Sequence, residues 1–344
     1  MTISCVDLFC GAGGLTHGFV KEGLPVAAGI DLDEACRYPY EKNNHATFLK
    51  RNVAEVTSEE LLELFGDAET TVLAGCAPCQ PFSTYSRRYD IHRNERWGLL
   101  YEFSRLIKST KPTVVTMENV PSVKHHEVFH DFVYELQQLG YHTWHHVVDS
   151  THYGVPQTRK RLVLLASLKG PISLIPKTHS KPKTVKQAIG RLSPIKAGET
   201  ANKDKLHTAA SLSELNLKRI KASKPGGTWR DWPDELVAKC HQESSGRTFS
   251  GVYARMEWDK PAPTMTTQCY GYGNGRFGHP EQDRAISLRE AAIIQGFPRN
   301  YKFLSRGQEV NLRALGRMIG NAVPVGLGQA IAKSIKEHVH PNLL

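Results

Sequence analysis

Close to its beginning the sequence reads Ser4-Cys5-Val6-Asp7-Leu8-Phe9-Cys10-Gly11-Ala12-Gly13-Gly14. Residues 4–8 have the apolar pattern of a short buried strand, the glycine cluster predicts a tight turn, and residues 15–22 predict a helix. Glycines in such a turn let a ligand approach the backbone, and the helix start offers free N–H groups. A glycine turn alone also fits plain helix–strand packing.

The alternation of strands and helices continues to residue 170. Strands are expected at 26–30, 71–75, 113–117 and 161–167, and helices at 101–109 and 127–139. This order predicts an α/β fold with a doubly wound, mostly parallel sheet, whose ligands lie at the carboxyl ends of the strands. Asp31 ends the second strand, where it can accept hydrogen bonds from a ribose. Because the glycine turn lacks GxGxxG spacing, the two features together indicate an adenosyl cofactor rather than a dinucleotide.

The composition changes after residue 170. Residues 177–224 are rich in Lys, Ser and Thr, and glycines and aromatics gather at 225–229 and 270–277. Regular helix patterns return at 287–295 and 325–338. We expect a second, smaller domain that is dominated by loops.

The 344 residues carry a formal net charge of +10, with a sequence pI of about 9.2. This balance favours a polyanionic partner, although a merely soluble basic protein also fits it. No apolar run approaches the ~18 residues that span a bilayer, and no basic leader opens the sequence, so we expect a cytoplasmic protein without a membrane partner. The seven cysteines are an odd number and unevenly spread, which argues against a disulfide framework.

Cys79 is the candidate nucleophile. It lies between Pro78 and Gln80, on a loop that Pro81 stiffens further. A stiff loop can hold a thiolate where it meets a reacting carbon. The alternatives are a buried structural cysteine, which the polar neighbours disfavour, and a redox pair with Cys76. Redox CxxC motifs usually open a helix, whereas the second proline indicates an extended loop.

Two further polar clusters adjoin strands. Glu118 follows the strand at 113–117, where a partly buried carboxyl group can donate a proton, although alone it is as typical of a surface acid. Arg159, Lys160 and Arg161 place three cations at the start of the strand at 161–167. They fit a solvated basic turn, or a site for a pyrimidine carbonyl or phosphates.

The stretch from His126 to His130 matches the HExxH pattern of zinc proteases on an expected helix. Both histidines lie beside the apolar stripe of that helix, and no third ligand follows at the usual spacing. We therefore expect no metal site. Stoichiometric zinc in the purified protein would restore the protease hypothesis.

Taken together and in order, the motifs resemble those of the DNA cytosine C5-methyltransferases over nearly the whole chain. The matching stretches are the glycine turn after Asp7-Leu8-Phe9, the Pro-Cys-Gln loop at 75–83, Glu-Asn-Val at 118–120, Gln-x-Arg-x-Arg at 157–161, a late helix at 284–292 with Gln-Gly-Phe-Pro at 295–298, and Gly-Asn-Ala-Val-Pro at 320–324. Each stretch is weak evidence by itself, but six in the family's order are very specific.

The resemblance implies a catalytic, S-adenosylmethionine-binding domain at 1–172, a target-recognition domain at 173–282, and a C-terminal segment at 283–344 that returns to the catalytic domain. The implied cofactor-binding residues are Phe9, Gly11, Gly13, Asp31, Leu32, Asn52, Val53, Pro78, Leu99, Asn321 and Val323. Two positions depart from the family pattern: Asn52 replaces an aspartate beside the adenine, and Leu32 replaces an aromatic residue. The Asn52 amide oxygen can still accept from the adenine amino group, so binding is expected to be weaker but not abolished.

The resemblance also implies a mechanism. The Cys79 thiolate adds to C6 of a cytosine, which makes C5 nucleophilic toward the sulfonium methyl. Glu118 holds or protonates N3, Arg161 binds O2, and Arg159 belongs to the same catalytic set. The base must leave the duplex stack to reach this site. Residues 83–97 are expected to form a mobile lid over the DNA backbone, and the implied DNA contacts are Gln80, Ser83, Arg87, Arg88 and Arg96.

We therefore expect a monomeric enzyme that methylates a cytosine in a specific sequence of double-stranded DNA. An RNA cytosine C5-methyltransferase is the alternative, because a related branch of the family methylates tRNA. The long segment at 177–267 favours duplex DNA, whose sequence is read in a groove. A DNA-binding regulator with an inactive catalytic fold is disfavoured by the intact Cys79, Glu118 and Arg161. By analogy, the compact chain suggests a bacterial or phage modification enzyme paired with a restriction enzyme.

Overall fold

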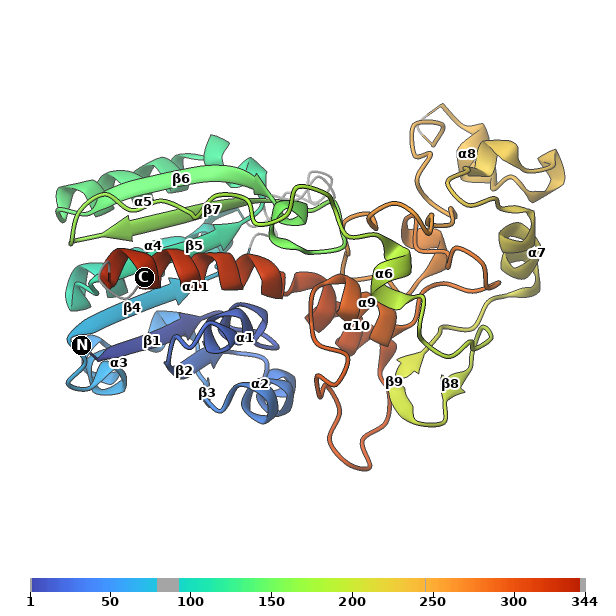
Figure 1. Ribbon diagram of the computed structural model, residues 1–344. Coiled ribbons are helices and arrows are strands. Elements are labelled where there is room, and N and C mark those ends of the chain that lie inside the picture. Colours follow the sequence, from blue (N-terminus) through green and yellow to red (C-terminus); the bar gives the residue numbers. More distant parts are fainter. Residues whose placement is uncertain (1, 79–92, 245, 341–344) are drawn as a thin grey trace. The chain divides into compact units, whose positions relative to one another are not determined.

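The computed structural model describes residues 2–78, 93–244 and 246–340, except for the side chains of residues 93–97. The chain divides into two compact units, whose elements are labelled in Figure 1. Unit 1 comprises Met1–Tyr153, Lys160–Thr178 and Val323–Leu344, and unit 2 comprises Gly154–Arg159 and His179–Ala322.

A mixed, mostly parallel sheet forms the centre of unit 1 (Figure 1). In the described residues it has seven strands in the order β3-β2-β1-β4-β5-β7-β6. The strands are β1 Ile3–Leu8, β2 Val26–Asp31, β3 Thr47–Lys50, β4 Thr70–Gly75, β5 Val114–Asn119, β6 His142–Asp149 and β7 Lys160–Ser167. Strands β1 to β5 pair in parallel, whereas β7 pairs antiparallel with β5 and with β6. The predicted doubly wound, mostly parallel fold is confirmed.

Helices cover both faces of this sheet (Figure 1). They are α1 Gly14–Lys21, α2 Arg37–Asn44, α3 Ser58–Phe65, α4 Arg93–Thr110, α5 Glu127–Gln138 and α11 Val325–Val339. Side chains of α3, α4 and α5 share a buried core with the sheet, including Phe65, Phe103 and Phe132. On the other face α11 packs against α1, where glycines at 18 and 328 let the two backbones approach closely. Among the described helices, none has the length and hydropathy needed to cross a membrane.

Unit 2 contains little regular structure. Its helices and strands are α6 Val185–Ile189, β8 Thr200–Ala201, β9 Asp204–Thr208, α7 Glu214–Ala222, α8 Lys239–Gln242, α9 Leu288–Ile294 and α10 Leu312–Asn321. A cluster that includes Trp229, Trp232 and Tyr272 supplies a core, and Arg284 and Glu290 form a fully buried ion pair at 2.7 Å. The loop-rich character predicted for this part of the chain is confirmed.

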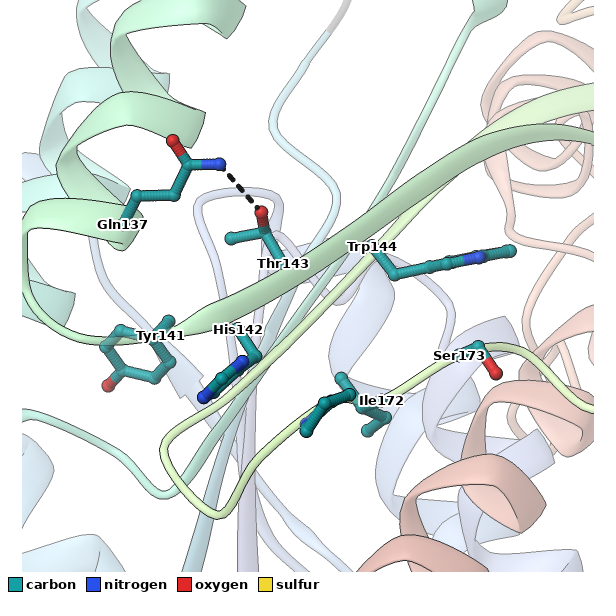
Figure 2. Close-up of a pocket in the computed structure, with 8 residues that line it drawn as sticks. Gln137, Tyr141, His142, Thr143, Trp144, Ile172 and Ser173 are labelled. Atoms are coloured by element: carbon teal, nitrogen blue, oxygen red, sulfur yellow. Dashed lines mark hydrogen bonds between the residues drawn. The ribbon is translucent and has the colours of Figure 1, made fainter.

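A hollow of about 530 Å³ opens at one end of the unit 1 sheet (Figure 2). Residues 141–144 and 171–173 line it, together with Gln137, whose Nε2 donates to Thr143 Oγ1 at 3.2 Å. Residue 142 of β6 pairs with residue 167 of β7, and residue 167 pairs with residue 114, the first residue of β5. The hollow therefore lies at the end of the sheet where β5 begins. Ligands of doubly wound sheets bind at the opposite, carboxyl ends of the strands, so the functional site is expected at the other edge.

Candidate active site

Three parallel strands bring the predicted clusters together at the carboxyl edge of the unit 1 sheet. Leu8 at the end of β1 is paired with Gly75 of β4, and Gly75 is paired with Met117 of β5. The next residues, at positions 9, 76 and 118, therefore lie side by side at this edge. The Cys76 N–H donates to the Leu8 carbonyl at 3.3 Å, which fixes the start of the loop that leaves β4.

Glu118 and Arg161 form the charged centre of this edge. Glu118 is opposite Val163 in the β5–β7 pairing, and Arg161 lies two residues earlier on β7, so both side chains project from the same face. Arg161 Nε lies 3.0 Å from Glu118 Oε1, with side-chain exposures of 12% and 8%. That distance makes an ion pair, yet Glu118 Oε1 is buried and has no aligned hydrogen-bond donor among the described residues. A buried carboxylate oxygen in this state can receive a donor from a ligand.

Cys76 is a neighbour of Glu118 that the sequence analysis considered only as a redox partner. Loss of hydration, and then the nearby Glu118 carboxylate, raise the pKa of the Cys76 thiol well above its ordinary value. Cys76 therefore stays a neutral thiol at neutral pH, whereas reactive thiols of redox pairs have lowered pKa values. This argues against the redox alternative. No local sequence signal predicts this contact, because it depends on the register between β4 and β5.

Asn119 also has a positioning role that sequence analysis did not assign. It ends β5, is buried, and its Nδ2 donates to the Ala77 carbonyl at 3.2 Å. Its Oδ1 accepts from the Val120 N–H at 2.8 Å. Asn119 thus ties the end of β5 to the backbone two residues before Cys79. Sequence analysis placed Glu118 after the strand, but β5 continues through Asn119, so Glu118 is held by strand pairing rather than by a loop.

The glycine turn after β1 has a sharply bent backbone with open space in front of it among the described residues. Phe9, Gly11 and Gly13 adopt positive φ angles of 57°, 52° and 84°, which turn the chain sharply before α1. A Cβ atom placed on Gly11 would meet no described atom within 4 Å, so the space in front of this backbone is open. The Gly11 N–H donates to Asp31 Oδ2 at 2.9 Å, which joins the turn to the end of β2.

Asp31 and its neighbour Leu32 have the chemistry that an adenosine requires. The second Asp31 oxygen, Oδ1, accepts from the Asp33 N–H at 2.9 Å, and each carboxylate oxygen keeps a further lone pair for a ribose hydroxyl. Leu32 is 65% exposed, which is unusual for a large apolar side chain and offers a surface for a ring. These residues fit the adenosyl part of S-adenosylmethionine.

Asn52 and Val53 stand at the end of β3, the neighbour of β2. Asn52 Oδ1 accepts from the Ala54 N–H at 3.2 Å and caps the 3-10 helix Val53–Glu55, while Val53 is buried. The remaining lone pair of the amide oxygen is available to an adenine amino group. Leu99 is partly buried on α4, Pro78 is exposed, and Val323 is buried in unit 1.

Gln157 and Arg159 lie in unit 2 and are buried there. The Gln157 amide donates to the Ile294 carbonyl at 3.1 Å and accepts from the Met265 N–H at 2.9 Å. The Arg159 guanidinium donates to the carbonyls of Met265 and Gly320, at 2.7 and 3.0 Å. These contacts join three distant segments of unit 2. Asn321, the last residue of α10, is exposed in the same unit.

Several predicted residues lie outside the described part of the chain. They are Cys79, Gln80, Ser83, Arg87 and Arg88, together with the side chain of Arg96. Of the lid predicted at 83–97, residues 83–92 also lie outside the described part of the chain, and α4 begins at Arg93. On the HExxH stretch, His126 precedes α5 and His130 is exposed on it. The described residues contain no group of three or more side chains arranged to hold a metal.

Comparisons with known proteins show the family to which the chain belongs. The family model of C-5 cytosine-specific DNA methylases matches residues 3–337. The type II methylase M.HgiDII of Herpetosiphon aurantiacus is 52% identical over 98% of this chain and 96% of its own length, and the type II methyltransferase M1.HphI of Haemophilus parahaemolyticus is 30% identical over 97% and 87%.

Among solved structures, a prophage-encoded candidate DNA modification methyltransferase of E. coli has the same fold. It superimposes with a TM-score of 0.76 at 21% identity, covering 98% of this chain and all of its own. A match to the family model along almost the entire length shows membership by itself. The chain belongs to the C-5 cytosine-specific DNA methylases and is an S-adenosylmethionine-dependent DNA (cytosine-5-)-methyltransferase.

Proposed function

We propose that the reaction is carried by Cys79, Glu118 and Arg161, acting on a cytosine extruded from a specific sequence of duplex DNA. The observation that carries this proposal is the buried Glu118 carboxylate, whose Oε1 has no aligned hydrogen-bond donor among the described residues and lies 3.0 Å from Arg161 Nε. A cytosine offers a ring nitrogen, an amino group and a carbonyl in one plane. A carboxylate and a guanidinium side by side match that edge.

In the proposed reaction, the Cys79 thiolate forms a bond to C6 and the electrons of the C5–C6 double bond move toward C5. Glu118 holds or protonates N3 while negative charge develops on the ring, and Arg161 neutralises the charge at O2. When bound, S-adenosylmethionine would supply the methyl group to C5 from its sulfonium, whose sulfur would be left as a neutral thioether. A water molecule then takes the C5 proton, the C5–C6 double bond re-forms, the sulfur–C6 bond breaks, and Cys79 returns to the thiolate.

We propose that the residues at the carboxyl edge of unit 1 hold the cofactor. Asp31 accepts from the ribose hydroxyls, the Gly11–Gly13 turn accommodates the methionine part, and Leu32 with Asn52 and Val53 contacts the adenine. The assignments of Phe9, Pro78 and Val323 to this cofactor rest on their positions in the family motifs, and those of Leu99 and Asn321 stay predictions from the resemblance. The arginines at 87, 88 and 96 are proposed to contact DNA phosphates.

A mechanism-based trap tests the nucleophile. A duplex whose target cytosine carries fluorine at C5 cannot lose that substituent as a proton, so the adduct persists as a denaturation-resistant complex. We expect the wild-type protein to be trapped and Cys79→Ser not to be. Cys76→Ser is the matched control, because it changes the other thiol of the same loop and should still be trapped. If Cys79→Ser were trapped and Cys76→Ser were not, Cys76 would be the nucleophile and the assignment of Cys79 would be wrong.

We infer further that the enzyme is the modification component of a type II restriction–modification system. Relatives such as the type II methylase M.HgiDII support this inference. Bisulfite sequencing of DNA from cells that express the protein tests this. The expected result is methylated cytosine confined to one short sequence. Methylation spread over unrelated sequences would contradict it, because such a pattern could not protect one restriction site.

A further inference from the structure

Unit 2 contains a second hollow, of about 600 Å³, whose floor is aromatic. The rings of Trp229 and His241 stack with their centroids 4.4 Å apart and their planes inclined by 2°. Trp232 lines the same hollow. All three side chains are at most 7% exposed, and both tryptophans belong to the core of unit 2. The floor is therefore part of the packed interior and is rigid.

The chain at 239–250, which we call the 239–250 loop, begins with α8 (Figure 1) and returns across this floor; its residue 245 lies outside the described part. Two hydrogen bonds fix its backbone: Trp229 Nε1 donates to the Phe249 carbonyl at 2.9 Å, and Arg230 Nη2 donates to the Arg247 carbonyl at 2.6 Å. Gln242 and Arg247 are nevertheless exposed, and Phe249 is 56% exposed. The loop thus presents outward side chains on an anchored backbone.

Three of the polar side chains that line this hollow have no partner in the described part of the chain. Asp234, Gln242 and Arg247 line it, and their side chains make no hydrogen bond or ion pair within the described residues. His241 adds a buried atom of the same kind. Its Nδ1 lies 3.2 Å from the Gly246 carbonyl, whereas its buried Nε2 has no hydrogen-bond partner in the described part of the chain. Unsatisfied buried polar atoms in native proteins are commonly sites for a ligand or an ordered water.

The combination of these groups identifies the ligand chemistry. A guanidinium reads guanine in the major groove, an amide reads adenine, and a carboxylate accepts from the amino group of cytosine. A surface that bound only phosphates would carry cationic side chains alone. Here Asp234 lines the hollow and Glu243 is exposed on the loop, so the surface also has acidic side chains. An exposed phenyl group such as that of Phe249 suits the methyl group of thymine.

We propose that the hollow and the 239–250 loop are the sequence-reading surface of the enzyme, in which Arg247 and Gln242 contact base edges of duplex DNA and select the cytosine that is methylated. This inference rests on the DNA methylation activity assigned above. It makes these two side chains specificity determinants and gives them no part in the chemical step.

Conservative variants test it on a library of duplexes randomised around one cytosine, with methylation read by bisulfite sequencing. Arg247→Lys keeps the charge but loses the planar fork, so preference at one base position should fall about 10- to 100-fold while overall DNA affinity stays near that of wild type. Gln242→Leu should relax a different position. Lys203→Ala removes an exposed cation in the turn between β8 and β9 and should keep the wild-type preference.

The alternatives give different results in the same library. If Arg247 contacted only phosphate, Arg247→Lys would keep the full sequence preference, which would overturn the proposal. An equal loss of methylation on every sequence in both variants would overturn it as well. Wild-type methylation measured in parallel reports the underlying activity separately, so failure of base selection is distinguishable from failure of the enzyme function. Because both side chains are exposed, unchanged thermal unfolding of the variants is expected and excludes misfolding.

Discussion

At the scale of single residues, the surroundings of Glu118 decide what its carboxyl group can do. Arg161 supplies a positive charge at 3.0 Å, Cys76 supplies a neutral thiol, and the carboxylate oxygen Oε1 has no aligned hydrogen-bond donor in the part of the chain that the structure describes. Leaving a buried acceptor unpaired costs on the order of 1–3 kcal/mol. A ligand that brings a donor recovers that energy, so the site is prepared for a group with an N–H at this position.

Glu118→Gln tests this role because it keeps the side-chain size but removes the negative charge and the ability of the group to take up and release a proton. We expect kcat to fall by about 10²- to 10⁴-fold, the usual range for a lost general acid–base group, with a much smaller change in KM for DNA. Single-turnover and steady-state methylation assays separate the two parameters. Glu102→Gln, at a partly exposed glutamate on α4, is the control. Turnover of Glu118→Gln close to that of wild type would remove Glu118 from the mechanism.

Asp7, next to the glycine turn, gives the protein a particular dependence on pH. It is 1% exposed, and its pKa is raised to about 7, mainly by burial, despite the hydrogen bond that Thr16 Oγ1 donates at 2.6 Å. The unfolded chain ionises near pH 4, so the folded state favours the neutral form. The stabilisation from Asp7 is therefore fully present below about pH 4 and is lost as pH rises through about 7.

Asp7→Asn imitates the neutral carboxyl group at every pH. Relative to wild type, we expect the variant to gain of the order of 1–4 kcal/mol of unfolding free energy as pH rises from 4 to 8. Denaturant unfolding at several pH values measures this difference. Asp67→Asn, at an exposed aspartate, should show no such trend. A constant difference between Asp7→Asn and wild type over the whole range would contradict the explanation.

At the scale of elements, the packing of α11 on α1 depends on a pair of glycines. A Cβ atom at Gly18 would lie 2.7 Å from the Cα of Gly328, which is backbone and cannot move aside. We expect Gly18→Ala to destabilise the protein by about 1–3 kcal/mol, as overpacking does. Gly98→Ala is the matched change on α4, where no described atom lies within 4 Å of the added carbon, and it should stabilise by about 0.5–1 kcal/mol. Equal effects of the two substitutions on thermal unfolding would be evidence against this contact.

Sequence patterns predicted the buried elements of unit 1 better than its exposed ones. Strands β1, β4 and β5 were predicted within a residue or two, because strands covered on both faces are read as continuous apolar runs. Strand β6, His142–Asp149, was missed because it is an edge strand with three histidines and an exposed valine. Helices α2, α3 and α10 were missed, although Leu315, Met318 and Ile319 give α10 a buried apolar stripe at helical spacing that a closer pattern search could have found.

The candidate site was predictable in part for a related reason. Residues that follow strands could be found from the local pattern alone, and those at positions 9 and 118 do adjoin at one sheet edge. The contact of Cys76 with Glu118 depends on the register between β4 and β5, which no local pattern contains. The stack of Trp229 on His241 joins residues separated by a loop, so it also required the fold.

At the scale of the whole molecule, the net charge of +10 predicts how DNA binding responds to salt. Each phosphate that a cation neutralises releases counterions, with a slope of about −0.9 in log K against log salt. Two such contacts already give about a tenfold loss of affinity between 50 and 200 mM salt, and more contacts give a steeper loss.

Titrations of a duplex at several salt concentrations measure this slope. Arg247→Lys should leave the slope unchanged, since it keeps its charge, whereas removing an arginine that contacts phosphate should reduce it by about one. A response that stays flat in wild type would mean that the excess positive charge does not face the DNA, and the phosphate contacts proposed for the arginines near α4 would then be wrong.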